Sequence, residues 1–563
     1  MSRVQAGAGE LAKTGPEWAG PGTPLETEPW TETTVDLKNV LKRGAGMAAI
    51  GLVIVQIVTV AQTLVLGRLL GPHEVGIFAA GSVMMGFITV FTQSTLGHAL
   101  IQREHDIEDA ANTVLIVTFV TGLLLAVAVL VASPLIGALF HDSRVGLIAA
   151  ANSGIMLLHS CPSVPDALMQ RTFQFKRRVI IDPAVALTFA SVSIVFAVIG
   201  YGAWAMVIGT YASAATWVLL SWWLAKWHPF RGRFSFRIWR ELAGFSLPLL
   251  LDGIAERSRD MVQQLLVGRA FGPAGLGQFR YGTRLAFLPA LTVVQTCGYV
   301  LFPAFSRISS DGTRFRQAFL RALGWIWLAA LPVGALLLAL GQPVVVLLLG
   351  EKWRAAGAAA SAMAGIVLCA ALTSVAAEAV KGAGRSRLLN WLSAINVGLG
   401  LPLIVLLLPF GLVGVGVAVS VTYMVCGFVT LVQARSVVGV SVRDTIACVI
   451  PSTLSAVIAL GVVMPLERFV VRSDRYPALL GLASIIAECV LFSVVYIGAL
   501  RLISPTWYGS IRDVVVRVLA KLADRARRSG VRWSIPMALL DHANAHTNTE
   551  HESEKSAWAS RSC

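Results

Sequence analysis

The sequence predicts an all-α polytopic membrane protein with fourteen transmembrane helices: two six-helix bundles related by an internal repeat, followed by two C-terminal helices. Three observations support this fold class. Of the 563 residues, 56% are hydrophobic and only 14% are charged, and the mean hydropathy of +0.72 is too high for a soluble globule. Uncharged runs long enough to cross a bilayer recur along the chain. One stretch of the sequence also recurs in a similar form in the second half of the chain.

The duplicated stretch defines the two halves. Residues 64–79 read LVLGRLLGPHEVGIFA, and residues 265–280 read LLVGRAFGPAGLGQFR. The positions that recur at an offset of 201 are Gly67, Arg68, Gly71, Pro72, Gly76, Phe78 and Gly97. Glycine and proline shape the backbone, so their recurrence at one offset indicates an internal duplication. Each copy lies between two apolar runs, and its Gly-Pro pair is therefore predicted to join two membrane helices in a tight turn.

The first half accounts for six spans. Residues 1–36 are rich in Gly, Pro, Thr and Glu, and they are predicted to be a disordered cytosolic tail rather than a signal peptide. Spans one to four are uncharged runs between Arg43 and Arg68, Glu74 and Arg103, Asp109 and Asp142, and Arg144 and Asp166. A longer run from Asp182 to Lys226 is divided by Gly200-Tyr201-Gly202 into spans five and six. Residues 37–226 therefore form the N-terminal lobe, and residues 227–241 form a basic cytosolic linker.

The second half, residues 242–435, repeats this arrangement. Spans eight to ten are the runs between Arg284 and Arg307, Arg321 and Glu351, and Arg354 and Glu378. The run from Arg387 to Arg435 splits at Pro409-Phe410-Gly411 into spans eleven and twelve. Residues 436–503 add spans thirteen and fourteen, between Asp444 and Glu467 and between Tyr476 and Arg501.

Span seven is predicted by the repeat and not by hydropathy. The repeat aligns residues 242–267 with the first span, yet this segment holds five charged residues, namely Asp252, Glu256, Arg257, Arg259 and Asp260. At roughly 2.5–3.5 kcal/mol for each mid-membrane charge, five charges facing lipid would cost on the order of 12–18 kcal/mol. These side chains must therefore face protein, each other or water.

Basic residues set the predicted orientation. The connections after even-numbered spans hold 19 Lys and Arg residues, against nine in the connections after odd-numbered spans. Positive charge resists translocation, so the even connections and both termini are expected to be cytoplasmic. The net charge of +15 is explained in this way, and it does not indicate a nucleic-acid partner. The seven cysteines lack CxxC spacing, so neither disulfides nor a metal site is expected.

Residues 504–563 form the C-terminal tail. Ile511, Val514 and Val518 recur at helical spacing opposite Arg512 and Arg517, which predicts a basic amphipathic helix on the inner membrane face. A solvated helix packed on cytosolic loops is the alternative. The rest of the tail is predicted to be disordered.

The charged residues of span seven are the main candidate site. Asp252, Glu256, Arg259 and Gln263 follow one face of a helix, with Arg257 and Asp260 beside them. Ionisable residues inside a membrane are expensive and usually mark a pathway or an ion pair. One interpretation is a polar cavity, and the other is a closed ion-pair network that serves only packing. Weaker polar candidates elsewhere are Gln62, Gln93, His98 and His159, and Glu488 in span fourteen has no obvious partner in its own helix.

The span arrangement and four motifs resemble the MOP superfamily, and within it the polysaccharide transporter branch of Wzx-type lipid-linked oligosaccharide flippases. The motifs are the duplicated Gly-Arg-x-x-Gly-Pro turn, LMQRTFQF at 168–175, GYGAWAMVIG at 200–209 and QPVVVLLLGEKW at 342–353. The resemblance covers residues 37 to about 503. It implies alternating access of two bundles around a cavity lined mainly by spans one, two, seven and eight. These flippases often place a carboxylate on span seven where this chain has Gln263.

The resemblance implies the function and the roles of the candidate residues. The protein would flip a polyprenyl-pyrophosphate-linked oligosaccharide from the cytoplasmic to the outer leaflet of the bacterial inner membrane, for cell-surface or exported polysaccharide. Arg257 and Arg259, helped by Arg284, would bind the pyrophosphate, because the guanidinium donor fork matches phosphate oxygens. Further substrate contacts would come from Gln263, Gln62, Gln93 and His98, and charge balance or coupling from Asp252, Glu256 and Asp260. The expected partners are the lipid-linked oligosaccharide, membrane lipids, a polysaccharide polymerase and glycosyltransferases, with no cofactor.

Three alternatives remain. A cation-coupled multidrug antiporter of the same superfamily would often hold an acid in the first span, but spans one to three contain none. A peptidoglycan lipid-precursor flippase would have the same number of spans and also a cationic cavity. A membrane glycosyltransferase or polymerase would need a sizeable external loop, yet every predicted external connection is short. The sequence also has no nucleotide-binding loop, metal cluster or nucleophile arrangement, so an enzyme is not expected.

Overall fold

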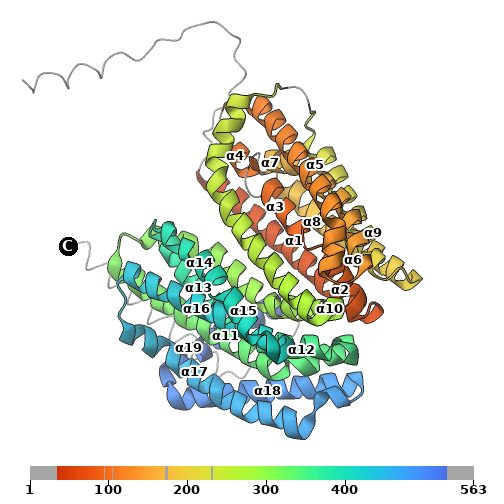
Figure 1. Cartoon of the computed structure of the whole chain (residues 1–563). Coiled ribbons are helices and arrows are strands. Elements are labelled where there is room, and N and C mark those ends of the chain that lie inside the picture. Colours follow the sequence, from red (N-terminus) through yellow and green to blue (C-terminus); the bar gives the residue numbers. More distant parts are fainter. Residues whose placement is uncertain (1–33, 94–95, 104, 172–174, 230–231, 529–563) are drawn as a thin grey trace, which may run out of the picture.

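The computed structural model describes residues 34–93, 96–103, 105–171, 175–229 and 232–528, whose regular structure is entirely helical. Figure 1 shows two bundles, one made by the N-terminal half of the chain and the other by the C-terminal half. Most of the two predicted tails, residues 1–33 and 529–563, lies outside the described residues. The first helix begins at Thr34, so the last three residues of the predicted N-terminal tail are helical.

The first bundle contains helices α1 to α9. Their bounds are α1 Thr34–Leu69, α2 Pro72–Gly81, α3 Met85–Gln93, α4 Leu96–Gln102, α5 Ile107–Leu139, α6 Ser143–Ser160, α7 Ser163–Arg171, α8 Phe175–Ile199 and α9 Ala203–Ala225. Two breaks fall where the sequence predicts them. Gly71 adopts an extended conformation just before Pro72 begins α2, and Gly200 and Gly202 separate α8 from α9.

The second predicted span is bent, which the sequence did not indicate. The axes of Pro72–Gly81 and Met85–Phe91 differ by 53°. At the break the side chain of Asn152, on α6, donates hydrogen bonds to the Gly81 carbonyl (3.2 Å) and to the Ser82 hydroxyl (3.0 Å). A helix can bend where a side chain satisfies the backbone groups that the bend releases. The bend therefore depends on a contact between residues about 70 positions apart.

Helix α10, Phe236–Ile308, belongs to both bundles. It breaks at Gly272, whose φ of 69° is left-handed and suits glycine, and Pro273 follows. Near its start, Ile238 and Leu242 lie in a buried cluster with Ala99 and Leu100 of the first bundle. After the break it packs against α12 and α13 of the second bundle. The charged stretch of predicted span seven thus lies between the two bundles (Figure 1).

The second bundle continues through α16. Its helices are α11 Gly312–Leu349, η1 Glu351–Trp353, α12 Arg354–Ala362, α13 Gly365–Gly382, η2 Ser386–Asn390, α14 Trp391–Gly398, α15 Gly400–Leu407, η3 Leu408–Phe410 and α16 Gly411–Val438. The chain turns back after η3, because α14 and α15 both pack on α16.

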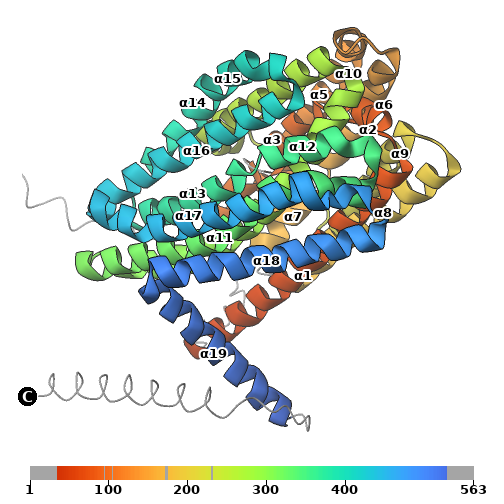
Figure 2. The ribbon, with the colours of Figure 1, turned by 90° about the horizontal axis from the view of Figure 1, so that it is seen from below.

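A helical hairpin covers the far side of the second bundle. It consists of α17 Val442–Pro465, η4 Leu466–Val471, η5 Ser473–Arg475 and α18 Ala478–Ile503. Helices α17 and α18 pack on each other and on α11. Figure 2 shows α19, Pro505–Arg528, extending away from this hairpin. The amphipathic helix predicted for the tail thus exists, and its place on a membrane surface stays a prediction.

The outer faces of the helices are suited to lipid. Of the described helices, ten are long and apolar enough to span a membrane, or eleven if the bent pair α2 and α3 counts as one span. Large apolar side chains point outward, for example Val131 (76% exposed) on α5 and Leu479 (84% exposed) on α18. Such extensive apolar exposure is not expected of a soluble protein. The chain is therefore a multi-pass membrane protein.

Candidate functional site

A cavity of about 830 Å³ lies between the two bundles. It is lined by residues of α1, α2, α3, α6, α8, α9, α10 and α16, and it lies within the usual size range of ligand sites. Of the residues that the sequence singled out, its wall contains Gln62, Glu256, Arg257, Arg259, Asp260, Gln263, Arg284 and His159. The charged side chains of span seven therefore face a cavity. The side chains of Asp252, Gln93 and His98 lie outside the described part of the structure.

The two copies of the duplicated turn meet at one end of the interface. A Cβ atom on Gly76 would lie 1.6 Å from the carbonyl oxygen of Pro273, and one on Gly277 would lie 2.0 Å from that of Pro72. We call these four residues the turn contact. The two approaches are reciprocal, because Pro72 and Gly76 precede Pro273 and Gly277 by the same 201 positions. Only glycine permits backbones to approach so closely.

Side chains reinforce this end of the interface. Arg68 of the first bundle donates from Nε to the Leu348 carbonyl (2.6 Å) and from Nη2 to the Leu347 carbonyl (3.3 Å). In the opposite direction, Trp353 donates from Nε1 to the Gly67 carbonyl (2.7 Å). Both acceptor groups are carbonyls near helix C-termini, which lack partners within their own helices. The turn contact and these hydrogen bonds together close one end of the space between the bundles.

Asp260 binds both arginines of span seven. Arg259 donates from Nη2 (2.7 Å) and Nε (3.2 Å) to the same carboxylate oxygen, and Nη1 of Arg257 lies 3.7 Å from the other. Glu256 lines the cavity, and among the described residues it forms no ion pair. Arg257 is the more accessible arginine, since its side chain is 41% exposed against 14% for Arg259.

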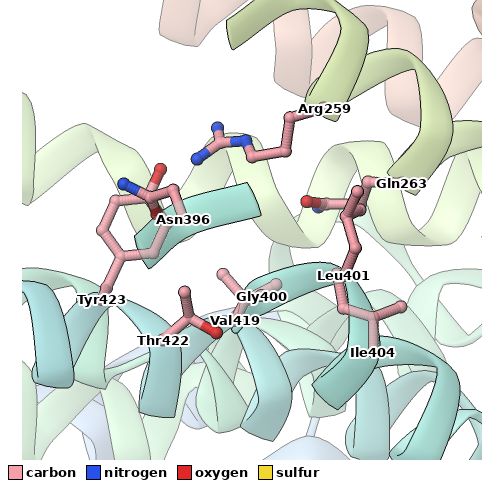
Figure 3. A pocket seen from close by; sticks show the side chains of 9 residues that line it. All are labelled: Arg259, Gln263, Asn396, Gly400, Leu401, Ile404, Val419, Thr422 and Tyr423. Atoms are coloured by element: carbon pink, nitrogen blue, oxygen red, sulfur yellow. The ribbon is translucent and has the colours of Figure 1, made fainter. Parts of the chain in front are cut away.

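A small recess holds Arg259 against the second bundle. Figure 3 shows its guanidinium group beside Asn396 and Tyr423, with Gln263 on the same helix and Thr422 below. The recess has a volume of about 10 Å³, close to the smallest that holds one water molecule. Asn396 donates to the Leu392 carbonyl (3.0 Å). Arg259 is therefore positioned as a fixed charge at the edge of the cavity rather than as a mobile side chain within it.

Two further arginines have no carboxylate partner within the described ranges. Arg280 and Arg284 lie one helical turn apart on the second part of α10 and both line the cavity. Neither forms an ion pair with any described acidic residue, and their like charges repel each other. The Arg280 guanidinium lies over the ring of Phe78, 5.8 Å from its centroid, in a cation–π contact between the bundles. From the sequence, Arg280 is one of the nine basic residues in the connections after odd-numbered spans. Its i, i+4 spacing from Arg284 nevertheless indicates that both side chains lie on one face of a helix.

The charge of the wall is asymmetric. Four arginines and two carboxylates, all on α10, leave an excess of two positive charges. The facing wall carries neutral hydrogen-bonding groups, among them Gln62 and Thr63 on α1 and Thr210 on α9. Aromatic rings, including Phe78, Phe279 and Tyr423, also line the cavity. Among the described residues no group of three or more His, Cys, Asp and Glu could hold a metal ion. The arrangement suits an elongated ligand with an anionic part and a neutral polar part.

Sequence comparison finds relatives in polysaccharide synthesis. The profile of a family described as "Polysaccharide biosynthesis protein" matches residues 65–358. The chain is 23% identical to the succinoglycan biosynthesis transport protein ExoT of Rhizobium meliloti, over 59% of this chain and 67% of ExoT. It is 22% identical to the teichuronic acid biosynthesis protein TuaB of Bacillus subtilis, over 80% of this chain and 94% of TuaB. The lipopolysaccharide biosynthesis protein WzxC of Escherichia coli is 23% identical, over 55% of this chain and 63% of WzxC.

Two solved structures share the fold. The lipid II flippase MurJ in an inward closed conformation superposes with a TM-score of 0.65 at 13% identity, covering 80% of this chain and 98% of MurJ. An inward-facing multidrug resistance MATE family transporter of the MOP superfamily gives a TM-score of 0.55 at 15% identity, covering 70% and 98% of the two chains. At these identities the comparison concerns the fold alone.

Proposed function

This chain belongs to the polysaccharide biosynthesis protein family, and from that membership we propose that it is a Wzx-type flippase. Its substrate is a polyprenyl-pyrophosphate-linked oligosaccharide, which it moves from the cytoplasmic to the outer leaflet of the bacterial inner membrane. The product serves the synthesis of cell-surface or exported polysaccharide. Glycosyltransferases that build the lipid-linked sugar and a polymerase that extends it are the corresponding partners. The protein is a transporter and not an enzyme.

The observation that carries this proposal is the excess of positive charge in the cavity. Two net positive charges would balance a doubly charged pyrophosphate diester, and Arg280 and Arg284 have no other described anion to bind. The neutral hydrogen-bonding wall across the cavity suits sugar hydroxyl groups. Of the residues considered, Arg257, Arg280 and Arg284 are the main pyrophosphate ligands. Arg259 and Asp260 position Arg257, and Gln62 and Gln263 contact the sugar.

The fourteen-span topology is part of the proposal. Beyond the eleven apolar spans, the two halves of α10 add two: the first half is the charged span seven, and the second contains the uncharged run between Arg284 and Arg307. The stretch Trp391–Val438 is too long for one crossing and breaks before Gly411, which adds the fourteenth. The reciprocal geometry of the turn contact supports the two-fold internal repeat. An even number of spans and the distribution of basic residues support a cytoplasmic location of both termini.

With this orientation, the turn contact lies on the external side, so the structure represents a state closed to the outside. The proposed cycle requires the turn contact and the Trp353 and Arg68 hydrogen bonds to separate when the cavity opens outward. The substrate enters from the cytoplasmic leaflet, with its pyrophosphate at the arginines and its lipid tail in the membrane. Such alternation between two discrete states is the basis of transport in two-bundle proteins.

A peptidoglycan lipid-precursor flippase is the second candidate, because MurJ shares the fold and that substrate class also contains a lipid-linked pyrophosphate. A multidrug antiporter fits less well, since a cavity with excess positive charge repels cationic drugs.

Deleting the gene should separate these functions. We expect lipid-linked oligosaccharide to accumulate on the cytoplasmic face and exported polysaccharide to be lost, while the peptidoglycan precursor pool stays constant. Extraction and quantification of both lipid-linked pools, with re-expression of the intact gene as control, measures this. Accumulation of the peptidoglycan precursor alone would support the second candidate, and unchanged pools would contradict both flippase assignments.

A further inference from the structure

Two glutamates are buried in the C-terminal hairpin, away from the cavity. Glu467 lies on η4 and Glu488 on α18, and they are 7% and 3% exposed. Neither lines the space between the bundles. Buried acidic residues in a membrane protein are costly unless they are paired, neutralised or used.

Glu467 organises the turn of the hairpin. Its carboxylate accepts hydrogen bonds from the Ser473 backbone amide (2.9 Å) and the Ser473 hydroxyl (2.8 Å). The hydroxyl of Ser484, on α18, lies 2.8 Å from that of Ser473 and extends this network. Glu467 thus fixes residues 466–475, the connection between α17 and α18.

Glu488 is placed differently, because both of its carboxyl oxygens are buried without a hydrogen-bond donor among the described residues. Glu488 lies one helical turn after Ser484 on α18, and Ser484 is linked to Glu467 through the Ser473 hydroxyl, so both glutamates belong to one buried region. Two ionised carboxylates in one buried region repel each other, and neither can donate a hydrogen bond. One proton shared between them would remove the repulsion and supply the missing donor.

The described surroundings of the two glutamates contain no compensating cation. Among the described residues, no lysine or arginine forms an ion pair with either glutamate. The charged residues of the packing helices lie at their opposite ends, namely Arg443 and Asp444 on α17 and Arg314, Arg316 and Arg321 on α11. At the hairpin turn, Asp474 is bound by Arg354, and the remaining charged residues are Arg468, Arg472 and Arg475. The thiol of Cys489 is next to Glu488 in sequence.

The hairpin turn is connected to the closed end of the cavity. Asp474, next to Ser473, accepts a hydrogen bond (2.6 Å) from Nη2 of Arg354, the first residue of α12. Arg354 follows Trp353, whose indole donates to the Gly67 carbonyl of the first bundle. A displacement of the hairpin turn can therefore reach the interface through the Asp474–Arg354 contact and the Trp353–Gly67 hydrogen bond.

We propose that Glu467 and Glu488 form a proton site, which holds one shared proton while the turn contact is closed. When the O–H bond breaks and the proton passes to water at the hairpin turn, two adjacent carboxylates remain. Their repulsion displaces the 466–475 turn, weakens the Asp474–Arg354 contact and favours separation of the bundles at the turn contact. This inference goes beyond the proposed function, since it concerns the protein without substrate.

The conformational test uses spin labels on two exposed turns. Cysteines replacing Tyr201 and Phe410 would carry the labels, in full-length protein whose native cysteines are replaced by alanine. We expect the distance between the labels to increase when the buffer changes from mildly acidic to mildly alkaline. Glu488→Gln should abolish this change and keep the short distance, because the amide is neutral and can donate to Glu467. Glu378→Gln, which alters another buried acid (9% exposed) that is paired with Lys381, should leave the change intact.

A second measurement addresses the proton itself. Infrared spectra of the wild-type protein at neutral pH should contain the carbonyl stretch of a buried protonated carboxyl group, and Glu488→Gln or Glu467→Gln should remove it. Absence of that band in the wild type would overturn the proposal, as would a pH-dependent distance change that persists in Glu488→Gln. A distance change that follows sodium concentration instead of pH would also overturn it.

Discussion

Replacing Arg280 and Arg284 together by glutamine should abolish export of polysaccharide while leaving the protein folded and inserted. Both side chains line the cavity, and within the described part of the chain they have no carboxylate partner. Their removal therefore leaves no buried acid uncompensated. Hydrogen bonds to charged groups contribute about 1.5–3 kcal/mol each, so losing two should weaken binding of the pyrophosphate roughly 100-fold or more.

The measurement is the amount of exported polysaccharide in a deletion strain that expresses each variant at equal level. Arg307→Gln removes a charge from the exposed far end of the same helix and should leave export unchanged. The double lysine variant keeps the charge but loses the donor fork, so it should retain part of the activity. Export at the wild-type level by the double glutamine variant would show that these two arginines do not bind the substrate.

Replacing Gly277 by alanine should block transport by preventing closure of the turn contact. The new Cβ would lie 2.0 Å from the Pro72 carbonyl oxygen and 2.9 Å from the Gly76 nitrogen. These are backbone atoms of the other bundle, so the overlap can be relieved only by moving the bundles apart. We expect at least a tenfold loss of export and a longer distance between labels at positions 201 and 410.

Gly71→Ala is the matched control, because Gly71 lies in the same turn but a Cβ there meets no atom within 4 Å. Its φ of −75° is also accessible to alanine. The melting temperature of both variants should stay near that of the wild type, since the overlap lies between bundles and not within one. Normal export together with an unchanged label distance in Gly277→Ala would contradict this prediction, because the added methyl group would then neither separate the bundles nor block transport.

The sequence predicted the parts of the fold that depend on local chemistry. Breaks at Gly71, Gly272 and Gly411 follow from Gly and Pro in otherwise apolar runs. The cavity position of Arg257 and Asp260 follows from the cost of a charge in lipid, which excludes the outer face of the helix. Both conclusions need only the residue and its immediate neighbours in the chain.

The features that the sequence did not predict depend on distant contacts. The bend in span two involves Asn152, and the recess that holds Arg259 involves Asn396 on α14 and Tyr423 on α16, which are far from it in the sequence. Arg280 was not predicted as a site residue because it precedes Arg284, the predicted start of span eight, and therefore fell in the connection before that span. The reciprocal turn contact was visible as a repeat in sequence, but the packing of one copy against the other was not.

The most direct test of the pyrophosphate site is equilibrium binding of geranyl pyrophosphate, a short water-soluble polyprenyl pyrophosphate, to the purified full-length protein. We predict binding that weakens with added salt, because arginine–phosphate contacts are charged, and that falls roughly 100-fold or more in the double glutamine variant of Arg280 and Arg284. Arg307→Gln should bind as the wild type does. Equal affinity of the wild type and the double variant would contradict the assignment of this cavity as the pyrophosphate site.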